Sequence, residues 1–132
     1  MDATKEVTDV IRDWERAIQA GNLDGILAHH VEDIVMFDVP TPLQLRGLKA
    51  YRETWELFFR YGAPHSEVFV IEDLRITAGS DVAFATGLLR ISGSPLPVCR
   101  LTLGLVQRDG RWLIAHEHHS APHTLADQEI PT

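Results

Sequence analysis

Hydrophobic positions near the start of the chain follow the period of a helix. Residues 7–18 carry apolar side chains three and four positions apart, namely Val7, Val10, Ile11, Trp14, Ala17 and Ile18. This spacing forms one apolar stripe and predicts an amphipathic helix within the first twenty residues. Gly21 is a suitable C-terminal stop, and Asn22 can cap a second short helix from Leu23 to about His29.

The next segment changes from an extended to a helical pattern. The stretch DIVMFDVP, residues 33–40, is typical of a short strand that Pro40 and Pro42 end. Apolar side chains then return at helical spacing, as Leu48, Tyr51, Trp55, Phe58 and Phe59. They predict a third helix from about Gly47 to Tyr61, with aromatic side chains along one face.

The rest of the chain has the pattern of β structure. Turn residues separate four strand-like runs: Ser66–Ala78, Asp81–Ser92, Val98–Arg108 and Arg111–Ser120. Asp109-Gly110 suits a type I′ hairpin turn, whereas the segment from Ser92 to Pro97 is a looser connection. In the third run the apolar side chains occupy the odd positions, 99 to 105, so we expect these positions to face inward.

Helices followed by an antiparallel meander predict an α+β fold. We expect one domain over residues 1–132, with three N-terminal helices packed on a strongly curved, mainly antiparallel sheet. The apolar fraction of 45% and the charged fraction of 23% are ordinary for a globular protein.

Charge and cysteine content narrow the function classes. The formal net charge is −7 and no Lys/Arg cluster exceeds two residues, which disfavours nucleic acid and anionic membranes as partners. Cys99 is the single cysteine and cannot form an internal disulfide, which fits a reducing cytoplasm. No run approaches 18 apolar residues, and the N-terminal residues MDATKEV lack the features of a signal peptide. We therefore expect a cytoplasmic protein.

Two stretches carry a family resemblance. The segments AGNLDGILAHHVEDIVMFDVP (residues 20–40) and RWLIAHEHHSAP (residues 111–122), with the order of elements, resemble the nuclear transport factor 2-like superfamily. The resemblance is closest to its SnoaL-like polyketide-cyclase and ketosteroid isomerase-related branch, and it extends from about Val7 to Pro122. It implies a cone-shaped fold that encloses an apolar pocket, in a homodimer. Fold alone does not settle function in so varied a superfamily.

The resemblance also implies roles for three residues. Asp38 matches the proton-shuttling carboxylate of ketosteroid isomerase-like enzymes, a system the physical literature of pKa tuning uses as a worked example. Trp14 stands where those enzymes carry a tyrosine that donates to the oxyanion, and Leu103 lies near their second donor. Steroid isomerisation by the familiar mechanism is therefore disfavoured, since each lost donor costs about 3–4 kcal/mol of transition-state stabilisation.

Asp38 has two interpretations from its local sequence. An aspartate before Val-Pro at a strand end often makes local backbone hydrogen bonds and only shapes a turn. Alternatively Asp38 faces the pocket, where Phe37, Val39 and the aromatic helix would desolvate the carboxylate and raise its pKa. Such a carboxylate could take a proton from the carbon beside a carbonyl group.

The last strand has four chemically active side chains on two faces. His116 and His118 share one face, and Glu117 and His119 share the other, because a strand alternates. Regular pairing across the Asp109-Gly110 turn places Leu103 opposite His116, which turns His116 and His118 to the pocket. The family resemblance instead turns Glu117 and His119 inward, since kinase association domains place a pocket arginine at the position of His119. A one-residue bulge would reconcile the two, and we favour this second arrangement.

A metal site and a nucleophilic cysteine are weaker hypotheses. His116 and His118 could share a metal, but the sequence offers no evident third ligand, and we expect no metal. Histidines hydrogen-bonded within a sheet or a subunit interface are the simpler alternative. No organic cofactor is implied, because the chain has no glycine-rich phosphate loop, and Cys99 has no sequence neighbour that would lower its pKa.

The remaining candidates concern the pocket wall. Arg90 lies within an apolar strand, where arginine usually extends to the rim, but the resemblance places a pocket arginine near it that would attract a carboxylate or enolate. Tyr51, Trp55 and Phe59 form one helix face that packs the core or also covers the cavity. We assign to ligand binding Trp14, Tyr51, Trp55, Phe59, Leu88, Leu103, His116, Glu117 and His118.

Two functions remain open from the sequence. The first is a cofactor-independent isomerase, cyclase or dehydratase in which Asp38 shuttles a proton and Arg90 or His119 stabilises oxyanion charge. Its ligand would be a small apolar molecule with a carbonyl or carboxylate group. The second is a non-catalytic ligand-binding or assembly module with the same pocket. A pocket-facing Asp38 near a second polar group favours the enzyme, and an Asp38 that only caps its turn favours the module.

Overall fold

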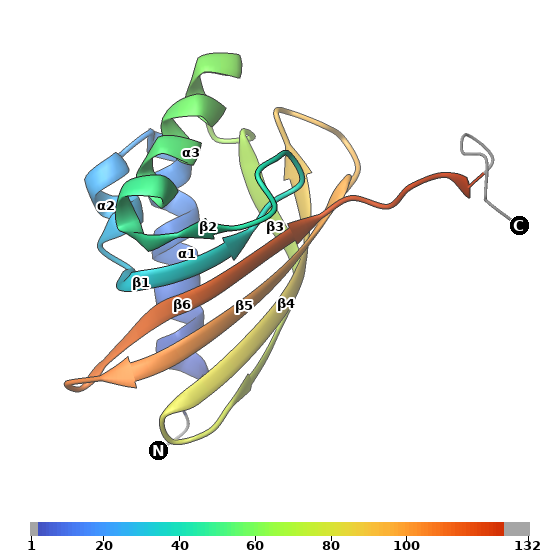
Figure 1. Cartoon of the computed structure of the whole chain (residues 1–132). Coiled ribbons are helices and arrows are strands. Elements are labelled where there is room, and N and C mark those ends of the chain that lie inside the picture. Colours follow the sequence, from blue (N-terminus) through green and yellow to red (C-terminus); the bar gives the residue numbers. More distant parts are fainter. Residues whose placement is uncertain (1–2, 126–132) are drawn as a thin grey trace, which may run out of the picture.

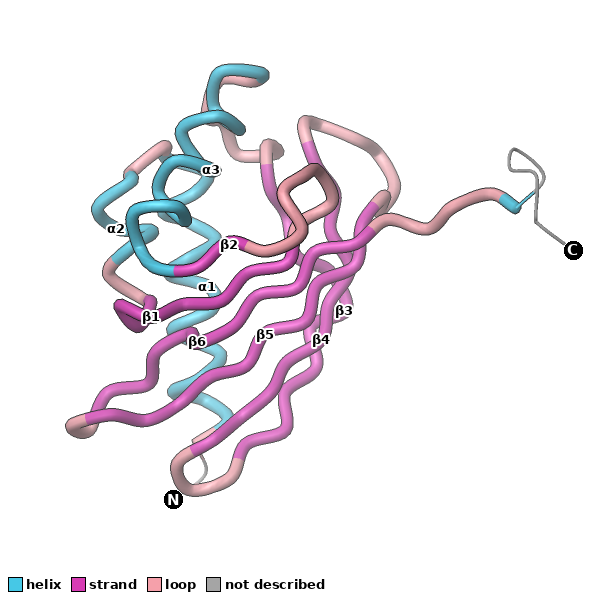
Figure 2. Tube along the Cα trace, in the orientation of Figure 1, coloured by secondary structure: helices cyan, strands magenta, loops and turns pink. Residues whose placement is uncertain are grey.

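A computed structural model describes residues 3–125 of the chain. Two helices and two strands come first and a third helix follows them: α1 (Thr4–Ala20), α2 (Leu23–Leu27), β1 (His30–Phe37), β2 (Leu45–Arg46) and α3 (Gly47–Tyr61). Four long strands complete the fold: β3 (Phe69–Ala78), β4 (Val82–Ile91), β5 (Cys99–Arg108) and β6 (Arg111–Ser120). The third helix therefore follows β1 and β2, so only two of the three helices precede the sheet (Figures 1 and 2).

Local signals in the sequence fix the two N-terminal helices. The predicted stripe of α1 buries Val7, Ile11, Trp14 and Ile18. Gly21 ends this helix with a φ of 67°, a left-handed conformation that glycine adopts without the steric cost of a Cβ atom. The Asn22 side chain then accepts a hydrogen bond from the backbone nitrogen of Gly25, which caps α2 as expected.

The six strands form one curved sheet in the order β2-β1-β6-β5-β4-β3. Neighbours are antiparallel except β1 and β6, which run parallel. The helices cover one side of the sheet, with α1 packed chiefly against β3 and α3 against β1 (Figure 1). The predicted α+β class and the mainly antiparallel sheet are confirmed. The opposite, convex side of the sheet has no helix over it.

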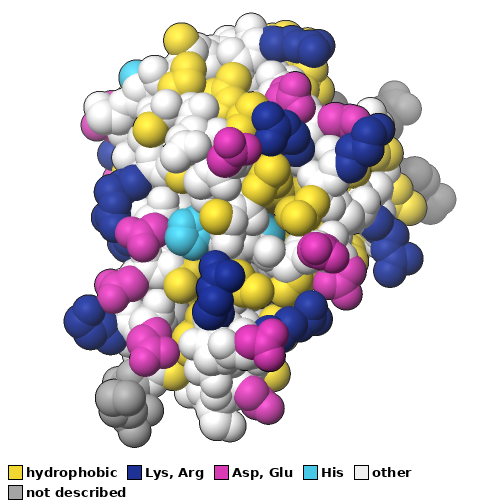
Figure 3. Space-filling model, turned by 90° about the vertical axis from the view of Figure 1, so that its left-hand side faces the viewer, with side chains coloured by type: hydrophobic (Ala, Val, Ile, Leu, Met, Phe, Trp, Pro, Cys, Tyr) yellow, Lys and Arg dark blue, Asp and Glu magenta, His cyan; other side chains and the backbone are white. Residues whose placement is uncertain are grey.

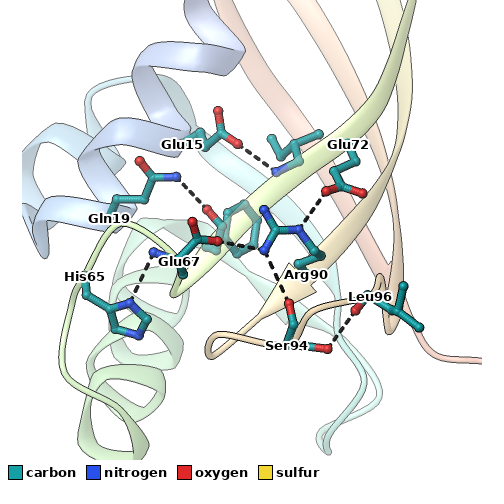
Figure 4. Close-up of polar contacts among 10 residues, drawn as sticks. Glu15, Gln19, His65, Glu67, Glu72, Arg90, Ser94 and Leu96 are labelled. Atoms are coloured by element: carbon teal, nitrogen blue, oxygen red, sulfur yellow. Dashed lines mark hydrogen bonds and ion pairs between the residues drawn. The ribbon is translucent and has the colours of Figure 1, made fainter.

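Side chains of α1 protect the edge strand β3. The Glu15 carboxylate accepts a hydrogen bond from the Ile71 nitrogen at 2.7 Å, and Arg12 donates to the Ile71 carbonyl at 3.0 Å. Gln19 donates to the Phe69 carbonyl at 2.9 Å, as Figure 4 shows. These bonds occupy backbone groups that an uncovered edge would leave open to another strand.

A bulge in the β5–β6 hairpin decides which side chains face the helices. Asp109 and Gly110 both have positive φ, of 53° and 76°, as a type I′ turn requires. Leu105 pairs with Ile114, but the next pair joins Gly104 to His116, so Ala115 is an extra residue. The extra residue reverses every later side chain.

The reversal turns Glu117 and His119 inward. Both side chains are buried on the concave face, where Leu103 pairs with Glu117 and Leu101 pairs with His119. The regular register derived from the turn alone was wrong beyond Ile114, and the arrangement with Glu117 and His119 inside is confirmed. Among residues 3–125, no helix has the length and hydrophobicity needed to span a bilayer.

Candidate functional site

A cavity of about 360 Å³ opens between α3 and the concave face of the sheet. Its volume lies at the lower end of the range for sites that bind small molecules. Most of its walls are apolar, and the lining residues are Met36, Asp38, Val39, Pro40, Thr54, Trp55, Leu57, Phe58, Tyr61, Phe69, Leu89, Ile91, Cys99 and His119.

Asp38 and His119 meet at this cavity from neighbouring strands. Met36 pairs with Glu117 and Phe37 with His118 in the parallel β1–β6 ladder, so Asp38 and His119 occupy the next positions. Adjacent strands are about 5 Å apart, which brings these two side chains close together. The expectation that Asp38 and His119 share a pocket is met by their positions in the wall.

Asp38 also takes part in its own turn. Its Oδ1 accepts a hydrogen bond from the Val39 nitrogen at 2.8 Å, and the residue is half-buried. Both interpretations of Asp38 therefore describe part of its environment: the carboxylate holds the turn and lies in the cavity wall.

Behind the cavity, a buried hydrogen-bond network centres on Glu117. The indole nitrogen of Trp14 donates to the Tyr51 hydroxyl at 3.1 Å, and this hydroxyl donates to Glu117 Oε2. His30 Nε2 contacts the same oxygen, while His119 Nε2 lies 2.8 Å from Oε1. All five side chains are buried, so the hydrogen bonds form away from bulk water.

The network keeps Glu117 ionised in spite of its burial. Burial alone would raise the pKa of the Glu117 carboxyl, but attraction from His30 and the hydrogen bonds of His119 and His30 outweigh it. The pKa of Glu117 falls from 4.5 to about 2. Burial, and then the charge of Glu117, raise the pKa of Tyr51 well above its usual value, so the phenol stays protonated.

An ionised Glu117 fixes the state of His119. A carboxylate only accepts hydrogen bonds, so the proton between the two groups sits on His119 Nε2. In neutral imidazole the other nitrogen, Nδ1, then carries a lone pair, and it makes no hydrogen bond with any residue from 3 to 125. His119 is thus a cavity-lining imidazole held by a buried carboxylate, an arrangement typical of a general base.

The aromatic helix α3 contributes to the wall with a different face from the one expected. Trp55 lines the cavity as predicted, but its neighbours there include Phe58 and Tyr61 rather than Phe59. Tyr51 lies beneath the wall, in the Glu117 network. Helical positions three and four apart share a face, and the wall lies one step round the helix from the predicted stripe.

Four other predicted ligand contacts lie outside the lining. Trp14 belongs to the buried network, and Leu103 packs in the core beside Glu117. Leu88 is partly exposed on the convex face, because the bulge in β3 and the alternation of β4 turn Leu89 inward instead. Glu117 itself does not line the cavity and acts on it through His119.

Arg90 is held at the rim by two carboxylates. Its Nε donates to Glu72 at 2.7 Å and its Nη1 to Glu67 at 2.7 Å, with a further bond to the Ser94 carbonyl (Figure 4). Hydrogen bonds to Glu67 and Glu72 raise the pKa of Arg90. The arginine is not part of the cavity wall, so its guanidinium anchors the β4–β5 connection and its expected catalytic position is not observed.

His116 and His118 lie on the convex side of the sheet. His116 Nδ1 is 2.7 Å from the Val35 carbonyl, and both rings pack edge-on against Phe37. Their expected place at the ligand is therefore not observed, because the Ala115 bulge turns them away. Within residues 3–125, no group of three or more His, Cys, Asp or Glu side chains forms a metal-binding arrangement.

Two further features complete the site. Cys99 lines the cavity, and burial, together with the charge of Asp38, raises the pKa of its thiol. His30 is the functional neighbour that sequence reasoning missed: its only signal was a histidine at the start of a buried strand, in AHHVED. On the face shown in Figure 3, acidic and basic side chains lie interspersed with apolar ones.

Comparisons with known proteins agree with this geometry. A family model for the SnoaL-like domain matches residues 7–124, so the chain belongs to the SnoaL-like family. An NTF2-like protein of unknown function from Pseudomonas putida is 30% identical, with a TM-score of 0.84 over 98% of this chain and 94% of its own. Among curated protein sequences, none matches the chain.

Two further solved structures share the fold. A candidate ketosteroid isomerase from Shewanella frigidimarina is 24% identical, with a TM-score of 0.66 over 85% of this chain and 92% of its own. A candidate dehydratase of the NTF2-like family from Streptomyces avermitilis is 13% identical, with a TM-score of 0.71 over 91% and 96% of the two chains. The expected superfamily is confirmed, and these likenesses describe the fold alone.

Proposed function

We propose that the protein is a cofactor-independent acid–base enzyme of the isomerase, cyclase or dehydratase type. The observation that carries the proposal is the cavity-lining His119, bonded at 2.8 Å to the fully buried and ionised Glu117. A base needs a lone pair at the substrate and a partner that stabilises its charged form. His119 has both, and Asp38 supplies a second proton-transfer group beside it.

The reaction begins with proton removal from a carbon next to a carbonyl group. His119 Nδ1 takes the proton, and the resulting imidazolium is stabilised by Glu117. Asp38, on the adjacent strand, carries the proton to or from a second position of the substrate. The Thr54 hydroxyl in the wall can donate a hydrogen bond to the carbonyl oxygen as negative charge develops there.

This assignment exchanges the roles expected from the sequence. Because Nε2 of His119 is engaged by Glu117, the cavity nitrogen is an acceptor, which suits a base better than an oxyanion donor. Arg90 has no part in the step, since Glu67 and Glu72 occupy its guanidinium at the rim. Without that cation in the wall, an uncharged apolar ketone or aldehyde fits the cavity better than a carboxylate.

Exchange of substrate protons with solvent tests the base directly. The protein is incubated in D₂O with a panel of small cyclic and aromatic ketones, and deuterium uptake at the α-carbon is followed by mass spectrometry. His119→Gln is expected to lower the exchange rate at least about 100-fold, the scale of general-base catalysis. His118→Gln, on the exposed convex side, serves as the matched control and should leave the rate unchanged. Equal rates in both variants would remove His119 from the reaction.

A second candidate function follows from the turn hydrogen bond of Asp38. A carboxylate committed to the Val39 nitrogen favours a non-catalytic module in which the same cavity binds a metabolite. Ketones that bind, as seen by a raised melting temperature, but never exchange protons in D₂O would support this module over the enzyme.

We also propose that the protein is a homodimer joined through the convex side of its sheet. Val82 and Phe84 of β4 point outward there and are 58% and 54% exposed, with Leu88 further along the strand. Large apolar side chains on one uncovered sheet face are typical of subunit interfaces.

A further inference from the structure

His30 lies behind the cavity wall and contacts the carboxylate that holds His119. It is the first residue of β1 and is buried, with its ring packed against Tyr51 at a centroid distance of 4.3 Å. Its Nδ1 is 2.9 Å from the Ile26 carbonyl of α2, and its Nε2 contacts Glu117 Oε2. His30 therefore joins α2 to β6 through its two ring nitrogens.

Groups with a single hydrogen-bonding role fix two hydrogens of the network. The Trp14 indole can only donate, so the Tyr51 oxygen accepts from it and must direct its own hydrogen at Glu117. The Ile26 carbonyl can only accept, so the hydrogen between it and His30 is on Nδ1. What remains is the hydrogen between His30 Nε2 and Glu117.

The position of this last hydrogen decides what His119 presents to the cavity. If His30 Nε2 lacked a hydrogen, Glu117 would have to be a neutral acid, whose proton can sit on either oxygen. A proton on Oε1 would be donated to His119 Nε2 and would move the hydrogen of His119 to Nδ1. The cavity nitrogen would then be a donor and could not act as a base.

We propose that His30 carries a hydrogen on both ring nitrogens and is a positioning residue, which keeps both oxygens of Glu117 as acceptors and so holds His119 with its lone pair toward the cavity. The positioning role rests on the proposed function, whereas the pattern of hydrogens does not depend on it. A charge-assisted bond to His30 and the Tyr51 hydroxyl together satisfy Oε2, while His119 satisfies Oε1.

The surroundings of His30 are compatible with one positive charge. From β6 it faces the negative Glu117, and from α3 and α1 it faces the uncharged Tyr51 and Trp14. His29 precedes it on the chain. On its outer side a shallow depression carries charges that largely compensate one another, from Glu32, Asp33, Arg108, Asp109 and Arg111.

Nitrogen NMR of the histidine rings tests the proposal on the full chain. Two-bond ¹H–¹⁵N spectra of the ¹⁵N-labelled protein distinguish protonated from unprotonated ring nitrogens and identify each tautomer. We expect His30 to show two protonated nitrogens, and His119 to show a protonated Nε2 with an unprotonated Nδ1. An unprotonated nitrogen in His30, or a protonated Nδ1 in His119, would overturn the proposal whether or not any substrate is turned over.

Two variants separate positioning from folding. His30→Gln removes the ring charge, and we expect a measurable population of His119 protonated at Nδ1, with at least a tenfold lower exchange rate on any active ketone. Tyr51→Phe removes the other donor to Oε2 but keeps His30, so His119 should keep its tautomer. An unchanged His119 spectrum in folded His30→Gln would contradict the positioning role. If that variant fails to fold, the wild-type spectrum still decides the pattern of hydrogens. An inactive protein with the expected spectra would count only against the proposed function.

Discussion

Glu117 shows how a single buried charge can be stable in a small domain. Removal of a carboxylate from water is costly unless its oxygens are satisfied, and here three side chains donate to them. The same bonds connect the hydrophobic core to the cavity, because Trp14 and Tyr51 belong to the core while His119 lines the wall.

Acid should weaken the fold through Glu117. Its pKa in the folded state is about 2, below the ordinary value of 4.5, so the unfolded chain binds the proton more tightly. The resulting stability is present above about pH 4.5 and is lost as the pH falls toward 2; it amounts to roughly 3 kcal/mol. Urea unfolding across this range should show a drop in the free energy of unfolding that is correspondingly smaller in Glu117→Gln. The exposed Glu56→Gln should behave like wild type, and identical pH curves for all three proteins would contradict the assignment.

Local sequence was informative about Asp38 and His119 and misleading about Arg90. Asp38 and His119 lie at a strand end or on a strand of known alternation, so a face could be assigned once a bulge was allowed. Arg90 was placed near the pocket by resemblance, but its outcome depends on Glu67 and Glu72, which lie 18 residues or more away in the chain. His30 was missed for the same reason, because its partner Glu117 is distant in sequence.

At the scale of elements, the end of α1 positions part of the site. Gly21 ends α1 and leads into α2, whose Ile26 carbonyl binds His30. A Cβ atom on Gly21 would lie 2.4 Å from Pro64 Cγ, and the φ of 67° is itself unfavourable for other residues.

Gly21→Ala is therefore expected to lower the free energy of unfolding by at least about 1–2 kcal/mol, as measured by urea denaturation. Gly62→Ala is the matched control, because Gly62 has an extended backbone and its added Cβ would meet only Ser92 Oγ at 4.0 Å. A Gly21→Ala protein as stable as the control would show that this helix end tolerates a side chain.

Sequence periodicity predicted the elements better than their pairing. The bounds of α3 and β6 agree with the helix from Gly47 to Tyr61 and the strand from Arg111 to Ser120. The two-residue β2 was not predicted, because so short a strand has no measurable period. The extra residue Ala115 was also beyond the local pattern, since its neighbours alternate normally on either side.

For the whole molecule, the concave and convex sides of the sheet have different roles. The concave side buries the core and the cavity, while the convex side exposes apolar side chains of β4. The parallel pairing of β1 with β6 belongs to this scale too, because only the complete sheet brings Asp38 beside His119.

The proposed homodimer makes a prediction about this convex side. Phe84→Glu places a charge in the interface and should convert the dimer to a monomer, as measured by sedimentation velocity at micromolar concentration. Leu43→Glu changes an equally apolar side chain, 96% exposed in the loop before β2, and should leave the dimer intact. A wild-type protein that sediments as a monomer would contradict the dimer.

A crystal structure with an exchanging ketone in the cavity would test the central claim most directly. We predict that the acidic α-carbon lies about 3–3.5 Å from His119 Nδ1, with Nε2 still bonded to Glu117. A ketone bound with that carbon at Asp38 and away from His119, or bound outside the cavity, would contradict the claim that His119 is the base.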